Sequence, residues 1–308
     1  MTVGFIGLGR MGKNMVIHLL ENGVSVVGYN RTQQKTDELS AEINNTIALT
    51  KFSGTFTPVF TIKELIEKMP PPRIIWIQID AGRPVDQVID ELLIAGISSN
   101  DIVIDGGNSY YKESVGRFDL LREKNIHFVD CGVSGGLEGA RYGAGLMIGG
   151  EKLTYEKLIP LLTMLAGKQG THTYFGQSGA GHYVKMVHNG VEYGMLQAIG
   201  EGFELLHRGS YPLNLHAVAS NWVKGSVVRG WLMDLLEQVL SGDPSLEKFQ
   251  GKIGGGETGD WTLATAKELN INMPALEQAV DMRQRTQDHP TFTGKIIAAL
   301  RWQFGRHV

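Results

Sequence analysis

Short apolar runs alternate with longer segments of helical period throughout the first 180 residues. The runs are apolar at successive positions, which is typical of strands buried on both faces of a parallel sheet. Joined by helices, they predict a doubly wound α/β domain with right-handed crossovers. The stretch 41–60 breaks the alternation, and we interpret it as an irregular insertion between the second and third strands. The runs are VGFIG (3–7), VSVVGYN (24–30), RIIWIQI (73–79), DIVID (101–105) and HFVDC (127–131), with a sixth strand around LMIGG and THTYF.

After Gly181 the strand pattern ends and only segments of helical period follow. A chain of 308 residues is twice the length of about 150 residues that is usual for one domain. We therefore expect an α/β domain over 1–180 and an all-helical domain over 181–308. The helical segments are 182–208, 214–241, 261–270, 274–287 and 292–304.

The helical domain contains two strongly apolar segments, 217–223 and 225–240. Because a domain of this size has a small core, these segments predict burial against another subunit in a homo-oligomer, either a dimer or a tetramer. The alternative is that the helices cover only each other and the α/β domain.

Charge and cysteine content exclude several classes of protein. With 29 basic and 32 acidic residues the net charge is −3, so the chain lacks the positive surface that nonspecific nucleic-acid binding requires. Cys131 is the only cysteine, so no intrachain disulfide can form, and a reducing, cytoplasmic location is expected. No apolar run approaches the roughly 18 residues of a membrane span, and the histidines have no partners at metal-ligand spacing. We expect no nucleic acid, membrane or metal partner.

Glycine is unusually frequent, with 40 of 308 residues. The first apolar run leads into a GxGxxG pattern that opens a predicted helix. In this context the first glycine permits a tight turn, the second lets the backbone approach a pyrophosphate, and the third lets the helix pack on the strand. A glycine turn chosen for packing alone is the alternative. The predicted dinucleotide-binding residues are Gly7, Leu8, Gly9, Arg10, Met11 and Gly12.

The end of the second strand carries Asn30, Arg31 and Thr32, where an NAD-specific site usually has a carboxylate for the ribose hydroxyl. A guanidinium and a hydroxyl suit a 2′-phosphate, through charge-assisted hydrogen bonds. These three residues therefore favour NADP over NAD. If Arg31 is instead a solvated surface residue, the site accepts both cofactors.

Five polar residues in the segment 179–194 fall on one face of a predicted helix, at offsets of 0, 3, 4, 7 and 8. A row of small residues lies on another face and would let the helix pack closely against a neighbouring backbone. The small residues are Gly190, Gly194, Ala198 and Gly202. The polar residues are Lys185, His188, Asn189, Glu192 and Tyr193, and the alternative is that they form a solvated stripe.

Several separate motifs make the sequence similar to the 6-phosphogluconate dehydrogenases, in their short form. The resemblance covers nearly the whole chain and is strongest in the last two motifs. The motifs are GLGRMGKNM with NRT, DGGNS (105–109), CGVSGGLEGARYG (131–143) and GAGHYVKMVHNGVEYG (179–194). The resemblance implies a Rossmann-type N-terminal domain followed by an all-helical substrate-binding and oligomerisation domain.

The resemblance also implies the activity: oxidation of 6-phosphogluconate at C3 by NADP, with loss of CO2 to give ribulose 5-phosphate. Lys185 would be the general base and then a proton donor to the C3 oxygen, and Glu192 would be the acid that protonates C1. Nucleotide contacts are implied at Ile79, Asp80, Ala81 and Asn108. Further substrate contacts are implied at Asn108, Ser134, Gly135, Gly136, His188, Asn189 and Tyr193.

For the substrate phosphate, the resemblance implies Arg283 together with a C-terminal Arg-x-x-Phe-Gly-x-His element, which contains Arg301 and His307. In the family that element reaches the active site of a neighbouring subunit. The sequence departs from the family pattern at 254–261, GGGETGDW, which lacks the family's phosphate-binding lysine. It also departs at Asp80, where a lysine often stands.

Two other functions remain open at this point. One is a related β-hydroxyacid dehydrogenase or semialdehyde reductase that acts on a small unphosphorylated acid. The other is a catalytically silent NADP-binding scaffold. Glu192, Tyr193, Arg283 and the C-terminal element argue against the first, and the presence of Lys185 with Glu192 argues against the second.

Overall fold

The computed structural model describes residues 1–47 and 52–306. It divides into two compact units, Met1–Lys185 and Met186–Val308. The division falls inside the long helix α8 (Ala180–Arg208) rather than at its beginning, where the sequence places the domain boundary. None of the helices among these residues combines the length and apolar character needed to cross a membrane.

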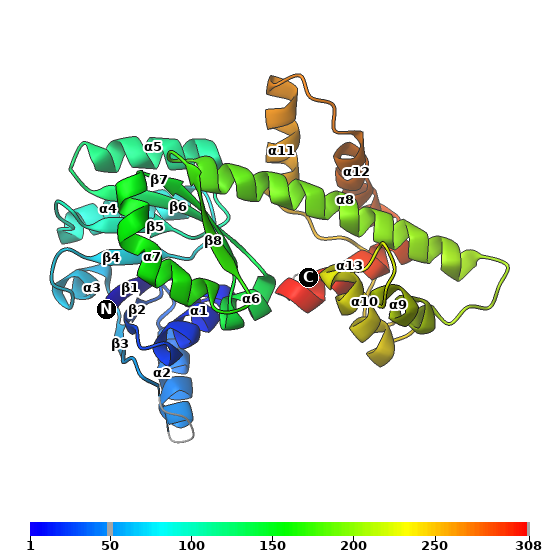
Figure 1. Cartoon of the computed structure of the whole chain (residues 1–308), viewed down its shortest axis with the longest axis horizontal. Helices are drawn as coiled ribbons and strands as arrows, with labels where there is room; N and C mark the ends of the chain where they lie inside the picture. The colour runs from blue at the N-terminus through cyan, green and yellow to red at the C-terminus, as the bar shows by residue number, and fades with distance from the viewer. Residues whose placement is uncertain (48–51, 307–308) are drawn as a thin grey trace. The chain divides into compact units, whose positions relative to one another are not determined.

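The first unit is built on one eight-stranded sheet with the order β3-β2-β1-β4-β5-β6-β7-β8 (Figure 1). Strands β1 to β6 pair in parallel, β7 is antiparallel to β6, and β8 is parallel to β7. The order reverses at β1, where a doubly wound sheet opens a crevice at its carboxyl edge. The strands are β1 (Thr2–Ile6), β2 (Ser25–Tyr29), β3 (Phe56–Val59), β4 (Ile74–Ile77), β5 (Ile102–Asp105), β6 (His127–Ser134), β7 (Gly145–Gly150) and β8 (Thr171–Gly176).

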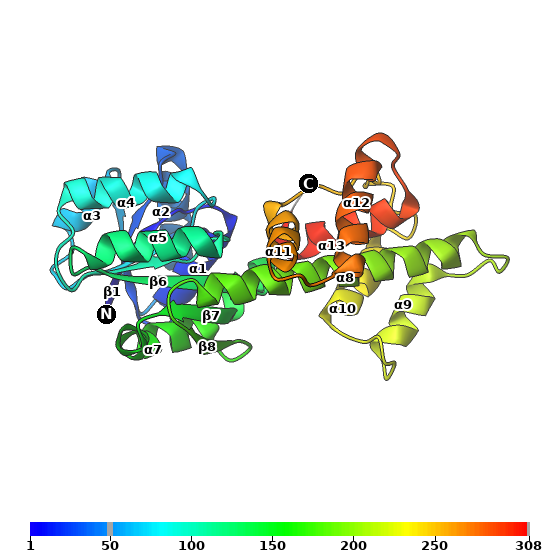
Figure 2. The same ribbon diagram turned by 90° about the horizontal axis from the view of Figure 1, so that it is seen from above.

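Helices cover both faces of this sheet, as the sequence predicts. A first group of four helices packs against one face, and a second group of three helices packs against the other, so the unit has two apolar cores. Figure 2 shows α3, α4 and α5 together on one side and α7 on the other. The first group is α1 (Arg10–Glu21), α2 (Gln33–Ile47), α6 (Gly136–Tyr142) and α7 (Lys152–Ala166); the second is α3 (Ile62–Glu67), α4 (Arg83–Ala95) and α5 (Tyr111–Arg122).

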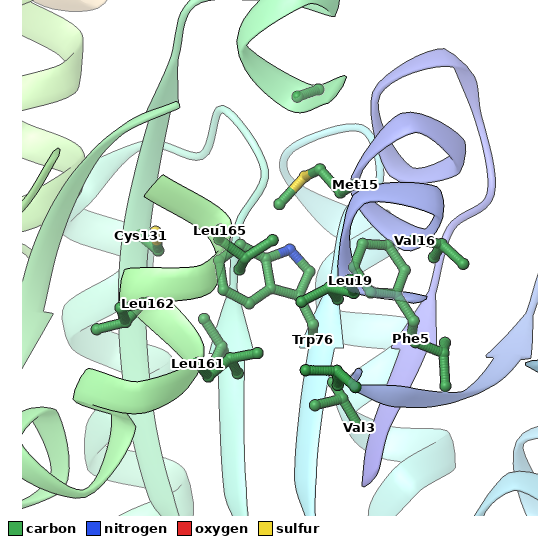
Figure 3. Close-up of a cluster of buried hydrophobic side chains, with 14 of the residues drawn as sticks. Val3, Phe5, Met15, Val16, Leu19, Trp76, Cys131, Leu161, Leu162 and Leu165 are labelled. Atoms are coloured by element: carbon green, nitrogen blue, oxygen red, sulfur yellow. The ribbon is translucent and has the colours of Figure 1, made fainter. Parts of the chain in front are cut away.

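Trp76 of β4 lies at the centre of the first core (Figure 3). Its ring is fully buried and stacks with Phe5 of β1 at a centroid distance of 6.3 Å. Leu19 of α1 and Leu165 of α7 belong to the same cluster. The indole N–H donates to Gln78 Oε1 at 3.0 Å, which ties the core to the residue that follows β4 at the carboxyl edge.

Two expectations for this sheet are wrong: a single sixth strand at LMIGG and THTYF, and an irregular insertion over 41–60. The segments LMIGG and THTYF form two strands, β7 and β8, and both run against the direction of the other six. Antiparallel pairing is possible because only the short α6 separates β6 from β7, whereas a parallel connection needs a dozen or more residues.

The stretch 41–60 is also more regular than the sequence indicates, because α2 extends to Ile47 and 56–59 forms β3. Pro58 interrupts the sequence pattern of a strand, but β3 is at the edge of the sheet, where a proline is tolerated. Residues 48–51 lie outside the described part of the chain.

The second unit is all-helical, as predicted, and its core joins α8 to α9, α10 and α13. The expected single helix over 214–241 is wrong, because residues 224–230 separate α9 from α10. Gly225 and Gly230 have positive φ angles of 80° and 155° there, which a continuous helix cannot contain. The helices after α8 are α9 (Leu215–Val223), α10 (Trp231–Gly242), α11 (Glu257–Glu268), α12 (Pro274–Asp288) and α13 (Phe292–Gly305).

The row of small residues on α8 packs within the chain at one end only. A Cβ on Gly190 would lie 3.0 Å from Thr262, whereas one on Gly194 or Gly202 would meet nothing within 4 Å in the part of the chain that the structure describes. Close packing occurs instead at Gly200, which faces α13. Apolar side chains of the segment 225–240 are exposed, Val227 fully, so its burial in another subunit stays a prediction.

Candidate functional site

The glycine-rich loop leaves β1 at the carboxyl edge of the sheet and begins α1. Gly7 has φ of +103°, and a Cβ there would overlap the carbonyl oxygen of Gln78. A Cβ on Gly12 would overlap the carbonyl oxygen of Gly7, so α1 lies directly on the loop. At Gly9 a Cβ would meet none of the described residues within 4 Å. The loop is therefore closed toward the sheet at its first and third glycines and open at its second, as a pyrophosphate site requires.

The beginning of α1 has the properties of an anion site. Gly9 is its N-cap and has no side chain that could cap the helix, and the first turn contains no acidic residue. The first amides of a helix have no acceptors within the helix, and they carry partial positive charge. These amides fit a dinucleotide phosphate, which would accept their hydrogen bonds.

The loop after β2 is held against the glycine-rich loop. Leu8 N donates to Asn30 Oδ1 at 2.9 Å, and Asn30 Nδ2 donates to the Thr32 carbonyl at 3.1 Å. The Asn30 side chain thus links the loop after β2 to the glycine-rich loop. Arg31 and Thr32 are exposed beside it, where they are accessible to a ligand that lies across the strand ends.

Two further loops reach the same edge from β4 and β5. Gly106 N donates to the Ile77 carbonyl at 2.8 Å, and a Cβ on Gly107 would lie 2.8 Å from the Ile79 carbonyl. The strands β2, β1, β4 and β5 are neighbours in the sheet, in that order. The segments that follow them, 30–32, 7–12, 79–81 and 105–109, therefore lie next to one another and contain the predicted cofactor residues. Asp80 and Asn108 are exposed at this edge.

A buried ion-pair cluster shapes the loop that contains Asn108. Asp105, at the end of β5, is fully buried and accepts hydrogen bonds from Gly107 N at 3.1 Å and Ser109 Oγ at 2.8 Å. The guanidinium of Arg117 on α5 donates to the same carboxylate at 3.3 Å and also pairs with Asp86 and Glu113.

Arg117 is not among the residues predicted from the sequence. The available signal was a basic residue at a core position of α5, one turn after Glu113.

The long strand β6 ends at the predicted sugar-acid residues. Ser134 is its last residue, and Gly135 and Gly136 follow with φ of +121° and +60°. A Cβ on Gly135 would lie 2.9 Å from Gly139 Cα, so the turn into α6 needs a residue without a side chain.

Lys185 belongs to the same unit as β6. A Cβ on Gly132 would overlap Cβ of Lys185, so the lysine lies directly against the strand two residues before Ser134.

In the second unit, the polar face of α8 packs against the loop 253–256. The Tyr193 hydroxyl donates to the Gly256 carbonyl at 3.2 Å, and the ring lies 3.4 Å from the Arg283 guanidinium carbon. His188 Nδ1 lies 3.1 Å from Asn189 Oδ1. Glu192 is half-buried on the same face.

Arg283 of α12 and Arg301 of α13 converge on one carbonyl oxygen. Both donate to Gly254 O, at 3.3 Å and 2.6 Å. Burial lowers the pKa of Arg283 to about 10, and the charge of Arg301 acts in the same direction. Burial also lowers the pKa of Arg301. Among the described residues neither has a carboxylate within ion-pair distance, although Glu192 attracts both.

Two nearby cations without a paired anion form a site that fits a phosphate group. Arg301 thus shares the Gly254 carbonyl oxygen with Arg283 of its own chain. The sequence-derived contribution of the C-terminal element to a neighbouring subunit stays a prediction. His307 lies outside the described residues.

Each unit matches a domain model of one protein family over most of its residues. Residues 2–176 match the NAD binding domain of 6-phosphogluconate dehydrogenase, and residues 181–293 match its C-terminal domain. The chain belongs to the 6-phosphogluconate dehydrogenase family. The resemblance seen in the sequence is confirmed, and the protein is an oxidoreductase of that family with an NAD(P)-binding domain.

Individual relatives of this family member differ in length and cofactor. An NAD(+)-dependent decarboxylating 6-phosphogluconate dehydrogenase of Haloferax volcanii is 38% identical over 100% of this chain and 98% of its own. The NADP(+)-dependent enzyme of Bacillus subtilis is 37% identical over 91% of this chain, which spans only 60% of that relative.

Among solved structures, 6-phosphogluconate dehydrogenase of Plasmodium falciparum has a TM-score of 0.82 and 32% identity, covering 93% of this chain and 62% of its own. A 3-hydroxyisobutyrate dehydrogenase of Mycobacterium tuberculosis shares the fold, with a TM-score of 0.72 at 21% identity over 96% of this chain and 97% of its own.

The substitution Arg117→Met tests the buried cluster. It leaves the fully buried Asp105 without its cation, so we expect the free energy of unfolding, measured by urea denaturation, to fall by about 3–5 kcal/mol. The control Arg122→Met on the same helix removes an exposed pair with Asp119 and should cost less than about 1 kcal/mol. Equal losses in the two variants would contradict the interpretation of Arg117.

Proposed function

We propose that this protein catalyses the NADP-dependent oxidative decarboxylation of 6-phosphogluconate to ribulose 5-phosphate and CO2. The observation that carries the proposal is the pair of arginines on one carbonyl oxygen, Arg283, which is buried, and Arg301, which is half-buried. A small unphosphorylated acid brings a single carboxylate, whereas a phosphate monoester carries more negative charge and three acceptor oxygens, which suit two guanidinium groups beside a loop of three glycines.

The loop 254–256 and its arginines account for the missing family lysine. Ile253 N donates to Thr286 Oγ1 at 3.0 Å, and Gln287 Nε2 donates to the Ile253 carbonyl at 2.8 Å, so α12 holds the loop at its beginning. The loop fixes the two guanidinium groups through Gly254 O. Arg283 stays protonated at neutral pH, since its lowered pKa is still about 10. We infer that the two guanidinium groups supply the charge that the lysine provides elsewhere in the family.

The preference for NADP rests on Arg31 and Thr32. Asn30 is committed to hydrogen bonds within the two loops, and no acidic residue stands at 30–32 to accept a ribose hydroxyl. A 2′-phosphate would gain charge-assisted hydrogen bonds from Arg31. When bound, the cofactor supplies the hydride acceptor for C3.

The proposed proton transfers use two groups of α8. Lys185 takes the proton of the C3 hydroxyl as hydride leaves, and returns a proton to the C3 oxygen while the C1 carboxylate is lost as CO2. Glu192 then protonates the enediol at the carbon that carried the carboxylate, which becomes C1 of the ketose. Asn108, Ser134, Gly135, Gly136, His188, Asn189 and Tyr193 are proposed to hold the sugar acid. We also propose a homo-oligomer in which the C-terminal element, with His307, completes a neighbour's site.

The deciding experiment incubates the protein with 6-phosphogluconate and NADP and follows NADPH absorbance together with CO2 release. We expect one CO2 for each NADPH. Reduction without CO2 would indicate a simple hydroxyacid dehydrogenase. Cofactor binding without reduction of any hydroxyacid would indicate a noncatalytic scaffold. Either result would contradict the proposal.

The substitution Arg31→Ala tests the cofactor preference. Loss of the guanidinium should lower kcat/KM for NADP by about 10-fold or more and leave kcat/KM for NAD within about 2-fold, since a charge-assisted hydrogen bond contributes about 1.5–3 kcal/mol. The measurement is the ratio of the two specificity constants for wild type and variant. An unchanged ratio would remove the assignment of NADP to Arg31.

The substitution Arg283→Met tests the phosphate site. We expect KM for 6-phosphogluconate to rise about 10- to 100-fold, because charge-assisted hydrogen bonds to the phosphate are lost, with the Kd of the cofactor unchanged. Arg285→Met on the same helix removes an exposed arginine paired with Asp281 and serves as the matched control. If both variants keep the wild-type KM, the phosphate is bound elsewhere.

A further inference from the structure

Asp130 occupies an unusual position in the first unit. It lies in the middle of β6 and is fully buried. In the part of the chain that the structure describes, no basic side chain lies within ion-pair distance of it. A buried carboxylate without a cation is costly unless hydrogen-bond donors replace its water.

The donors come from the beginning of α8. Gly179 N donates to Asp130 Oδ1 at 2.7 Å, and His182 N donates to Oδ2 at 2.9 Å. Ser178 Oγ lies 3.5 Å from Oδ1. The first turn of α8 contains no acidic residue, so its amides are satisfied by a carboxylate from the sheet rather than by a local cap.

Three glycines leave room for this contact. Gly149 is the register partner of Asp130 on β7, and a Cβ there would lie 2.6 Å from both carboxylate oxygens. A Cβ on Gly181 would lie 2.7 Å from the Asp130 carbonyl oxygen and would overlap the Met147 carbonyl. Gly132 lies against Lys185 in the same way. The beginning of α8 therefore lies close to β6 and β7, with the Asp130 carboxylate in contact with its amides.

The side of β6 that faces α8 carries Asp130, Gly132 and Ser134, because alternate residues of a strand point to the same face. The first binds the helix end, the second packs on Lys185, and the third is the proposed substrate residue at the strand end. A shift of α8 along the strand would therefore move Lys185 relative to Ser134.

A second set of hydrogen bonds fixes the rotation of α8 about its axis. The His182 Nδ1 atom lies 2.7 Å from Ser114 Oγ on α5, and Ser178 Oγ donates to the Ser114 carbonyl at 3.3 Å. His182 and Ser114 are both buried. The first turn of α8 is thus held by β6 through its backbone and by α5 through its side chains.

We propose that Asp130 is a positioning residue that fixes the register of α8 on β6 and so places the amino group of Lys185 for proton transfer. The inference rests on the proposed role of Lys185. Asp130 acts through the helix and does not contact the substrate. Because small misplacements of a reacting group lower rates strongly, its loss is expected to change kcat rather than cofactor affinity.

The test compares two buried aspartates. Asp130→Asn keeps one acceptor oxygen but places an N–H donor where the second oxygen accepts an amide N–H. We expect kcat with 6-phosphogluconate to fall about 10- to 100-fold, with the cofactor Kd and the helix content unchanged. Asp101 serves as the control, since it is also fully buried and accepts from the backbone amides of Arg73 and Ser98, although it also pairs with the Arg73 guanidinium at 2.8 Å. Asp101→Asn should lower Tm while kcat stays within about 2-fold of wild type.

An unchanged kcat in Asp130→Asn, or an equal fall in Asp101→Asn, would overturn the proposal. Hydrogen exchange of the wild-type protein gives a second test that does not depend on how the variants fold. The His182 amide, which has no acceptor within the helix, should exchange as slowly as the β6 amides, and fast exchange would also overturn the proposal.

The wild-type reaction is measured first. If the wild type does not oxidise 6-phosphogluconate, the proposed function fails, whereas exchange at His182 still tests the contact with Asp130.

Discussion

Direct contact between backbone atoms positions the candidate site in the first unit. The helix α1 lies on the glycine-rich loop because Gly12 meets the carbonyl oxygen of Gly7, and α8 lies on the sheet because Gly181 meets that of Met147. A methyl group at either glycine would force the elements apart. The frequency of glycine in this chain reflects, at these positions, a requirement for helices to approach strands more closely than any side chain allows.

Two buried carboxylates complete the same edge from neighbouring strands. Asp105 of β5 and Asp130 of β6 are register partners in the sheet. The first is compensated by Arg117 and shapes the loop of Asn108, whereas the second is compensated by helix amides. Each replaces the water around a buried charge with several fixed donors, so the surrounding backbone can adopt only a narrow range of conformations.

The alternation of apolar runs and helical segments was sufficient to predict the layered fold, the glycine-rich loop and the all-helical second unit. It did not predict the direction of β7 and β8, because an apolar run has the same appearance in either orientation. The sequence did not predict β3 because it contains Pro58. A proline is tolerated only at the edge of a sheet, and the place of β3 at that edge depends on the tertiary structure. The proposed site residues were taken from motifs, and their functions stay predictions. Arg117 and Asp130 make contacts 12 and 49 residues away in sequence, and only Arg117 left a local signal, as a basic residue at a core position of a helix.

The buried thiol of Cys131 can serve as a probe for opening of the first unit. Its thiol is fully enclosed in the core of the first unit, and burial, together with the nearby charges of Asp130 and Asp105, raises the pKa of the thiol well above its usual value. A protonated, enclosed thiol reacts with alkylating reagents only when the surrounding structure opens. Since the sequence contains no other cysteine, the rate of alkylation reports how often the nucleotide-binding unit opens.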